Sequence, residues 1–222
     1  MNKNIIRFTT KGQDRHMNIQ NFEERLRNAN QNNETYTLDS IENWADKLWH
    51  ECGLCDEFNA TPIIKIAKLF NFDVFQTDKL RKEYGGTICI NCEDYVSQGY
   101  EKLILINTYE ELFQQRFVIA HELGHYLFEY IGSDYETKGQ EYVKPYERNV
   151  HEDLAEQQAN RFASCILMPK RIFAAEYNRL MNQNKDQLYI TKYLSRYFKV
   201  KEEYVIIRIR EIFRKFYFSV SI

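Results

Sequence analysis

The 222-residue sequence lacks any apolar run of the roughly 20 residues that a membrane-spanning helix needs. A secretory signal is not expected, because residues 1–8 contain too few apolar side chains in succession. A strong net charge is absent as well, since 30 lysines and arginines nearly balance 32 aspartates and glutamates. With 44% hydrophobic residues, the chain is predicted to be a cytoplasmic globular protein with one large core, or a core with an appended subdomain.

Cysteine is scarce, and its five positions form no pattern that decides a fold. Cys52 and Cys55, like Cys89 and Cys92, form C-x-x-C pairs, a spacing found in structural zinc sites with four thiolate ligands. The 33 residues between the pairs exceed the usual gap, and a disulfide framework is disfavoured in a reducing cytosol. We therefore expect free thiols, with Cys165 packed in a helix.

The most informative stretch is residues 117–125, an apolar segment that ends in H-E-x-x-H. On a helix, positions i and i+4 lie about 40° apart, so His121 and His125 project from one face and can bind one metal ion. Glu122 lies beside that ion, where a general base can take a proton from water. The opposite stripe is apolar and predicted to be buried. The alternative is a pair of ordinary histidines on an amphipathic helix.

A second stretch, residues 156–163, offers a third ligand. A catalytic zinc takes three protein ligands and keeps one position open, and two histidines with a carboxylate are one of its usual sets. Glu156 suits that role, and Asn160 follows it on the same helix face, where it can hydrogen-bond a ligand imidazole. Glu152 and Asp153 are competitors, unless they form a solvated first turn favoured by the helix dipole.

These stretches resemble a known family. RFVIAHELGH at residues 116–125, E-x-x-A-N-x-F-A at 156–163 and Leu-Met-Pro at 167–169 are similar to the ImmA/IrrE family of zincin-like metallopeptidases. The resemblance extends from about residue 38 to residue 169. The polar first segment and the long basic tail depart from it.

The resemblance implies His121, His125 and Glu156 as ligands of Zn²⁺, with Mn²⁺ as an alternative, and Glu122 as the general base. It also implies a bacterial or phage cytoplasmic metalloendopeptidase that cleaves a helix-turn-helix transcriptional repressor. His151 could polarise the substrate carbonyl, although a surface histidine at a helix start is commoner. Two other functions stay open: a metal-binding regulator that does not cut its partner, and a DNA-binding protein with a zincin scaffold.

The predicted fold class is α+β, with a small antiparallel or mixed sheet, the H-E-x-x-H helix and a helical C-terminal extension. Residues 1–34 are rich in Asn and Gln and are interpreted as a polar, loosely attached or disordered arm with a helix near 18–29. Residues 35–169 form the zincin-like domain. Residues 170–222 form a basic, mainly helical subdomain with 12 lysines and arginines against 5 aspartates and glutamates.

Three strands are expected, at 72–77, 86–91 and 102–107. The last is apolar on both faces and suits an inner position, whereas 86–91 is mixed and suits an edge that could hold a peptide by strand addition. The polar segment 133–148 is expected to form a lid.

Cap signals predict where the helices of the first two thirds begin. Asp39 with Glu42, and Thr108 with Glu111, have the spacing of capping boxes, and Thr61 precedes a proline at a first helical position.

Further helices are expected near 172–181, 187–198 and 202–213, followed by a short strand at 216–222. The rhythm of residues 193–203 is typical of a helix-turn-helix, which makes DNA binding conceivable. A helical subdomain with a solvated basic face is the commoner case, so binding of nucleic acid is not expected.

Overall fold

The computed structural model describes residues 5–7, 19–32, 36–54, 60–147 and 153–217. In this part of the chain one sheet contains the strands β1 (Ile5–Arg7), β2 (Asp73–Thr77), β3 (Tyr84–Ile90), β4 (Lys102–Asn107) and β5 (Tyr142–Glu147). The helices are α1 (Ile19–Gln31), α2 (Leu38–Glu51), α3 (Ile63–Leu69), α4 (Glu93–Val96), α5 (Leu112–His125), the π-helical turn η1 (Tyr126–Tyr130), α6 (Asp134–Thr137), α7 (Leu154–Leu167), α8 (Lys170–Asn182), α9 (Gln187–Phe198) and α10 (Glu202–Tyr217). None of the described helices combines the length and apolar character that crossing a membrane requires.

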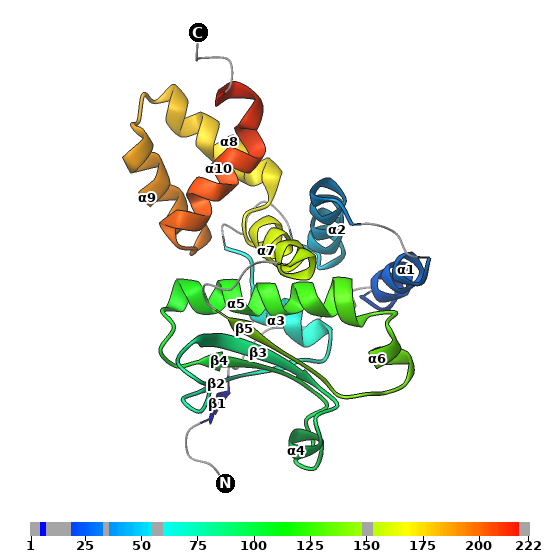
Figure 1. Ribbon diagram of the computed structural model, residues 1–222. Helices are drawn as coiled ribbons and strands as arrows, with labels where there is room; N and C mark the ends of the chain where they lie inside the picture. Colours follow the sequence, from blue (N-terminus) through cyan, green and yellow to red (C-terminus); the bar gives the residue numbers. More distant parts are fainter. Residues whose placement is uncertain (1–4, 8–18, 33–35, 55–59, 148–152, 218–222) are drawn as a thin grey trace.

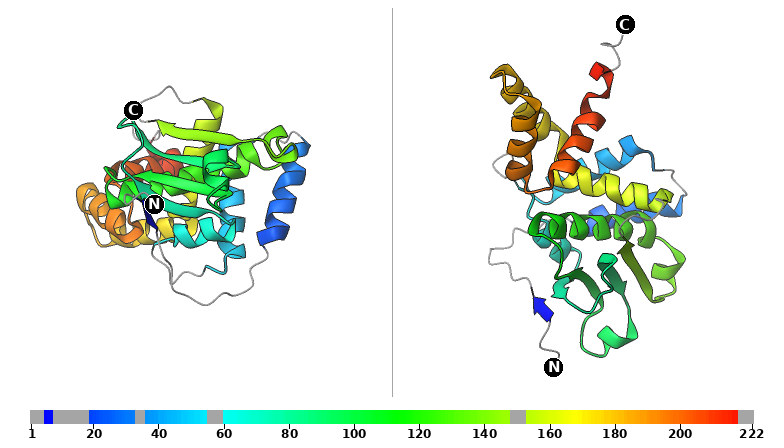
Figure 2. Two further views of the ribbon diagram at one scale, coloured as in Figure 1. Left: turned by 90° about the horizontal axis from the view of Figure 1, so that it is seen from below. Right: turned by 60° about the vertical axis from the view of Figure 1, so that its left-hand side comes forward.

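The sheet is mixed, with strand order β1-β2-β4-β3-β5. Strands β2 and β4 are parallel, and the other neighbouring strands are antiparallel. The main helices lie on one face, with α5 directly on the sheet and α7 and α2 in the next layer (Figures 1 and 2). This arrangement agrees with the predicted α+β class.

The inner position predicted for β4 is confirmed, but the edge position predicted for β3 is wrong. Strand β5 pairs with β3 and forms the edge instead. The polar Thr87 suggested an edge, yet its hydroxyl donates to Lys144 O at 2.8 Å, so pairing leaves it satisfied. The segment 133–148, predicted as a lid, contains α6 and β5 over its described residues.

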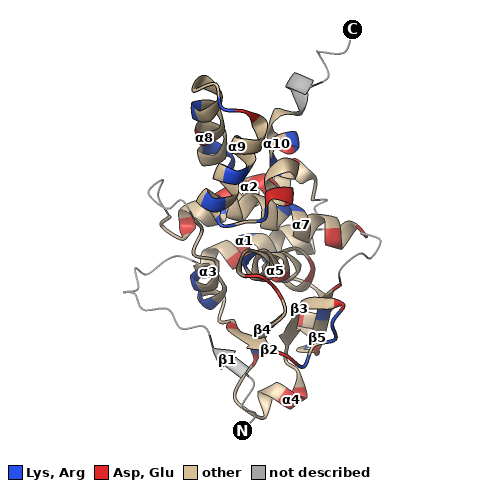
Figure 3. Ribbon diagram, turned by 90° about the vertical axis from the view of Figure 1, so that its left-hand side faces the viewer, with Lys and Arg blue, Asp and Glu red and all other residues tan. Residues whose placement is uncertain are grey.

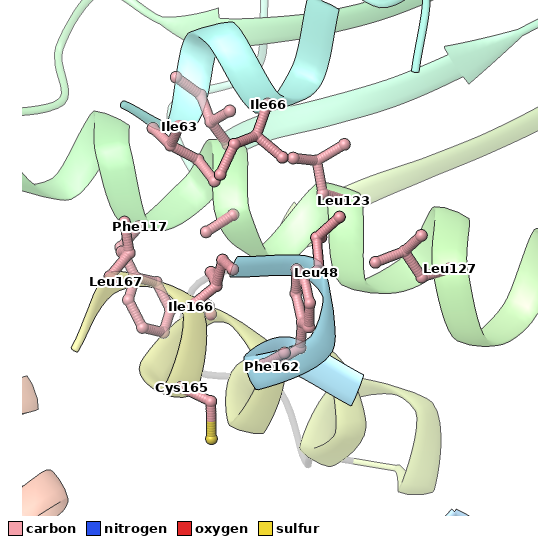
Figure 4. Close-up of a cluster of buried hydrophobic side chains, with 14 of the residues drawn as sticks. Leu48, Ile63, Ile66, Phe117, Leu123, Leu127, Phe162, Cys165, Ile166 and Leu167 are labelled. Carbon is pink, nitrogen blue, oxygen red and sulfur yellow. The ribbon is translucent and has the colours of Figure 1, made fainter. Parts of the chain in front are cut away.

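Two apolar clusters hold the sheet between them. The larger lies between the sheet and the helices and draws side chains from α2, α3, α5 and α7 (Figure 4). The smaller contains Phe75, Cys89, Cys92, Leu103 and Leu105. Alternate residues of β4 enter the two clusters, since Ile104 and Ile106 belong to the larger one. This accounts for a strand that is apolar on both faces.

Helix α5 is largely buried from Gln114 onward, because the sheet, α3 and α7 surround it. Its predicted capping box is wrong: Glu111 is the N-cap and makes no side-chain cap hydrogen bond. Thr37, rather than Asp39, caps α2 by accepting a hydrogen bond from Ser40 N. Thr61 donates its hydroxyl to Ile166 O instead of capping α3.

Residues 19–32 are not a loosely attached arm. In α1 the apolar side chains Phe22 and Leu26 are fully buried in the larger cluster. Asn30 donates to Leu127 O at 3.1 Å and to Ile131 O at 2.6 Å, which ties α1 to η1. The polar composition concealed an apolar stripe of helical spacing. Most of the remainder of this arm lies outside the described residues.

The three C-terminal helices lie where the sequence predicts them, and Lys199, with φ 55°, makes the turn between α9 and α10. The expected strand at 216–222 is wrong at its start, because α10 continues to Tyr217. Buried side chains of all three helices belong to the larger cluster. The parts before and after residue 169 thus share one core. The division into two domains at this residue stays a prediction.

Candidate metal centre

Three side chains from two helices converge on one point. His121 Nε2 lies 2.9 Å from His125 Nε2, and the Glu156 carboxylate lies 3.2 Å from the first and 3.3 Å from the second. Among the described histidines, cysteines and acidic residues, only these three form a group that could hold a metal ion. Ligands of a tetrahedral zinc lie roughly 3.3 Å apart when the metal–ligand bonds are near 2.0 Å. The spacing therefore suits one divalent cation.

The far side of each imidazole is held by an oxygen. His121 Nδ1 lies 2.9 Å from Asn160 Oδ1, and His125 Nδ1 lies 3.0 Å from Glu129 Oε2. Both oxygens accept hydrogen bonds, so each Nδ1 donates and each Nε2 can present its lone pair to a metal. Two imidazole nitrogens and a carboxylate are a donor set that zinc accepts, and the residues present fit the ion.

Burial and hydrogen bonds within the cluster shift the pKa values of its histidines and of Glu156. Burial lowers the pKa of His121 and keeps its ring neutral. Burial would also lower the pKa of His125, but hydrogen bonds to Glu129 and Glu156 raise it to about 9. The pKa of Glu156 is held well below its ordinary value, against the effect of burial, by hydrogen bonds from both histidines. The site thus favours positive charge, and a divalent cation would take the place of the histidine proton.

Glu122 follows His121 on α5 and is fully buried. Neither of its carboxylate oxygens has a hydrogen-bond partner among the described residues. Burial raises the pKa of Glu122 to about 8. An ionisable side chain without a partner is costly to bury and is found chiefly at functional sites.

The position of Glu156 depends on the close approach of α5 and α7. A Cβ atom at Gly124 would lie 2.8 Å from Ala159 Cα, so only glycine allows the two backbones to meet there. Asp153 caps α7 by accepting a hydrogen bond from Glu156 N at 2.8 Å, which removes it as a competing ligand. Glu152 and His151 lie outside the described residues.

Three residues at the site were missed from the sequence. Glu129 accepts from Lys144 Nζ at 2.8 Å as well as from His125, and the Tyr146 ring packs edge-on against His121 at 4.6 Å between centroids. Glu129 stands four residues after His125, and that helical spacing could have indicated it. No comparable spacing indicates Lys144 and Tyr146, because the sequence predicts a polar lid segment where β5 lies.

The expectation of free thiols agrees with the described cysteines. Cys52 belongs to the larger apolar cluster, whereas Cys89 and Cys92 belong to the smaller one. A site with four thiolates therefore does not form from the described residues, and Cys55 lies outside them. Cys165 is buried in α7 and accepts a hydrogen bond from Arg208 Nη1 at 3.4 Å.

Comparisons with known proteins identify a family and a related fold. A family model, the IrrE N-terminal-like domain (Peptidase_M78), matches residues 70–210. Among solved structures, a Mycobacterium tuberculosis transcriptional regulator has a similar fold, with a TM-score of 0.52 at 19% identity. The similarity covers 85% of this chain but 51% of that protein, so the chain spans about half of its length. No curated protein matches the sequence.

Proposed function

Because the chain belongs to the family of IrrE N-terminal-like domains, we propose that it is a metal-dependent endopeptidase that acts in the cytoplasm. His121, His125 and Glu156 would hold the ion, Zn²⁺ or alternatively Mn²⁺, and Glu122 would act as general base. The observation that carries the proposal is the convergence of three donor atoms beside a buried carboxylate that has no described partner.

A divalent cation at this point would supply a Lewis acid that polarises a peptide carbonyl and makes water more acidic. Glu122 takes the proton of the attacking water and passes it to the leaving amine. Positive charge on His125 and Lys144 lowers the pKa of this carboxylate and so partly offsets the burial that raises it. Asn160 and Glu129 hold the two imidazoles, and Lys144, 3.5 Å from Glu156, adds to the positive charge at the carboxylate.

Strand β5 is an edge of the sheet among the described strands, and this position supports a polypeptide as the substrate. Lys144 and Tyr146 of this strand contact Glu129 and His121, so the edge runs beside the proposed ion. An extended peptide can pair with such an edge by strand addition. Of protein substrates we favour a helix-turn-helix transcriptional repressor, which rests on the family resemblance.

The test is Glu122→Gln, which keeps size and helix propensity but cannot accept a proton. We expect the variant to fold, hold about one equivalent of metal and bind the repressor, while its cleavage rate falls by on the order of 10²-fold or more. His121→Ala should lose the metal, and His50→Ala should keep it, since His50 is exposed on α2. Equal cleavage by parent and Glu122→Gln would remove Glu122 from its role. Binding without cleavage by either would favour a non-cleaving regulator.

A further inference from the structure

A cavity of about 340 Å³ lies among α5, α7, α10 and β5. Its lining includes Phe117 of α5, Asn160 of α7, Tyr146 of β5 and Ile207 of α10. Binding cavities for small molecules run from roughly 300 to 1,000 Å³, so this volume has room for a large side chain.

The cavity borders the candidate metal centre. Asn160 lines it and hydrogen-bonds His121 Nδ1, and Tyr146 lines it and packs against the His121 ring. A peptide that pairs with the edge of β5 would pass the metal-binding residues and reach the cavity at Tyr146. A side chain next to the scissile bond is therefore the group best placed to enter it.

Apolar and aromatic side chains make up half of the residues that line the cavity, namely Leu38, Phe117, Tyr146, Tyr204 and Ile207. The rings of Phe117 and Tyr204 stack at 3.8 Å between centroids, with 5° between their planes, and Tyr204 donates its hydroxyl to Gln114 at 2.9 Å. Leu38 and Ile207 stand on the rim with 50% and 46% of their surface exposed. An apolar occupant would cover these surfaces and gain the free energy of their burial.

The charged groups of the cavity are already paired. Arg161 and Glu211 both line it, and Arg161 Nη1 lies 2.5 Å from Glu211 Oε2. Arg161 Nη2 lies 2.7 Å from Glu42, and Ser164 donates its hydroxyl to Glu211 at 3.2 Å. A charged side chain would have to break these contacts, so the cavity disfavours a lysine, an arginine or an acidic residue.

We propose that this cavity is a substrate subsite, which accepts a large aromatic or aliphatic side chain that flanks the scissile bond. The inference rests on the proposed peptidase function and gives α10 a part in specificity. The C-terminal helices thereby help to choose the substrate without contacting the reacting atoms.

The test uses Ile207→Trp, which fills the cavity, with Ile206→Trp as the matched control. Ile206 is the neighbouring residue of α10, similarly exposed, and does not line the cavity. Each metal-loaded full-length protein is given an equimolar peptide library, and the residues flanking every cleaved bond are read by mass spectrometry. We expect the parent and Ile206→Trp to prefer Phe, Tyr, Leu or Met at one flanking position. Ile207→Trp should shift that preference to small residues by about tenfold or more while still cutting.

A second measurement does not depend on cleavage. Binding of p-cresol, the side chain of tyrosine, is followed by NMR, and we expect saturable shifts at Phe117 and Tyr204 that Ile207→Trp abolishes and Ile206→Trp retains. Leu38→Trp, at another exposed apolar residue of the lining, replaces Ile207→Trp if that variant does not fold. Cleavage with the same preference in all variants would overturn the subsite and leave the peptidase function intact. No cleavage of any peptide or protein by the parent would overturn both.

Discussion

Glu129 contacts the candidate metal centre without being one of its three converging side chains. Its carboxylate accepts from both His125 Nδ1 and Lys144 Nζ, and these partners lower its pKa to about 2 against the effect of burial. The carboxylate therefore stays ionised at neutral pH and makes His125 a stronger donor. Lys144 in turn fixes the carboxylate in place.

Replacing Glu129 by glutamine should weaken metal binding without unfolding the protein. Partners of this kind are worth roughly 10- to 100-fold in metal affinity, so we expect a loss of that size for Glu129→Gln. The measurement is competition for Zn²⁺ against a chelating dye. Glu147→Gln, an exposed carboxylate at the end of β5, is the control and should match the parent. Unchanged metal affinity in Glu129→Gln would show that the hydrogen bond from His125 to the Glu129 carboxylate does not contribute to metal binding.

At the residue scale, the spacing of residues along one helix predicted which side chains share a face. Contacts between segments distant in the sequence could not be predicted in this way. The i and i+4 rule placed His121 and His125 on one face, and the same rule placed Asn160 beside Glu156, as the structure has them. Tyr146 could not be found this way, because its contact with His121 depends on where β5 joins the sheet. Their roles in metal binding and catalysis remain predictions.

At the scale of elements, α5 and α7 must meet closely for Glu156 to reach the two histidines. Gly124→Ala would place a Cβ 2.8 Å from the Ala159 backbone and force the helices apart. We expect a loss of about 1–3 kcal/mol in the free energy of unfolding, with weaker metal binding. Urea denaturation and metal titration measure the two effects. Asn178→Ala, at an exposed position of α8, should change neither. Unchanged stability and metal binding in Gly124→Ala would mean that α5 and α7 can separate enough to accommodate the Cβ.

Helices α2, α7 and α10 are joined by four charges. Arg208 is fully buried and pairs with Glu42 and with Glu211 at 3.1 Å, and Arg161 pairs with the same two carboxylates. Burial would raise the pKa of Glu42, but the two arginines lower it below its ordinary value of 4.5. The folded state therefore binds this proton more weakly than the unfolded chain does.

The Glu42 charge should make stability depend on pH in a defined direction. Its contribution is present above the unfolded pKa and is lost as pH falls through the lower folded pKa. We expect the urea midpoint of the parent to fall between about pH 5 and about pH 3, and Glu42→Gln to be less stable at neutral pH but less pH-dependent. Glu51→Gln, a surface partner of Arg25, should follow the parent. Equal slopes for all three would exclude Glu42 as the source.

Periodicity located most elements, whereas caps and edges were predicted poorly. The strand at Lys102–Asn107 and the helix at Gln187–Phe198 agree with their expected bounds because burial on both faces or on one stripe leaves a strong local pattern. Thr37 and Asp39 are both residue types that are favoured at N-caps, and the local sequence does not decide which of them begins α2. Strand β5 was not predicted because its sequence is short and polar and because it pairs with β3, which is distant in the sequence.

Across the whole molecule, basic residues gather on the C-terminal helices, and Lys and Arg are visible on α8 and α9 (Figure 3). Residues 170–222 carry +7, but Arg208 is buried and Arg179 pairs with Glu176. This leaves a diffuse solvated charge rather than an ordered surface for reading bases.

We therefore expect only weak DNA binding by the full chain. Affinity for a short duplex should not depend on its sequence and should disappear at moderate salt, as measured by fluorescence anisotropy. Duplexes of shuffled sequence are the control. Binding that prefers one sequence and survives physiological salt would support the DNA-binding alternative instead.

The four charges that join α2, α7 and α10 also constrain how this chain can evolve. Glu42 and Arg161 lie before Pro169, and Arg208 and Glu211 lie after it. A descendant that exchanged its C-terminal helices for an unrelated module would leave Glu42 and Arg161 facing a surface that was not selected with them. Recombination after Pro169 should therefore succeed only in lineages that change positions 42 and 161 at the same time.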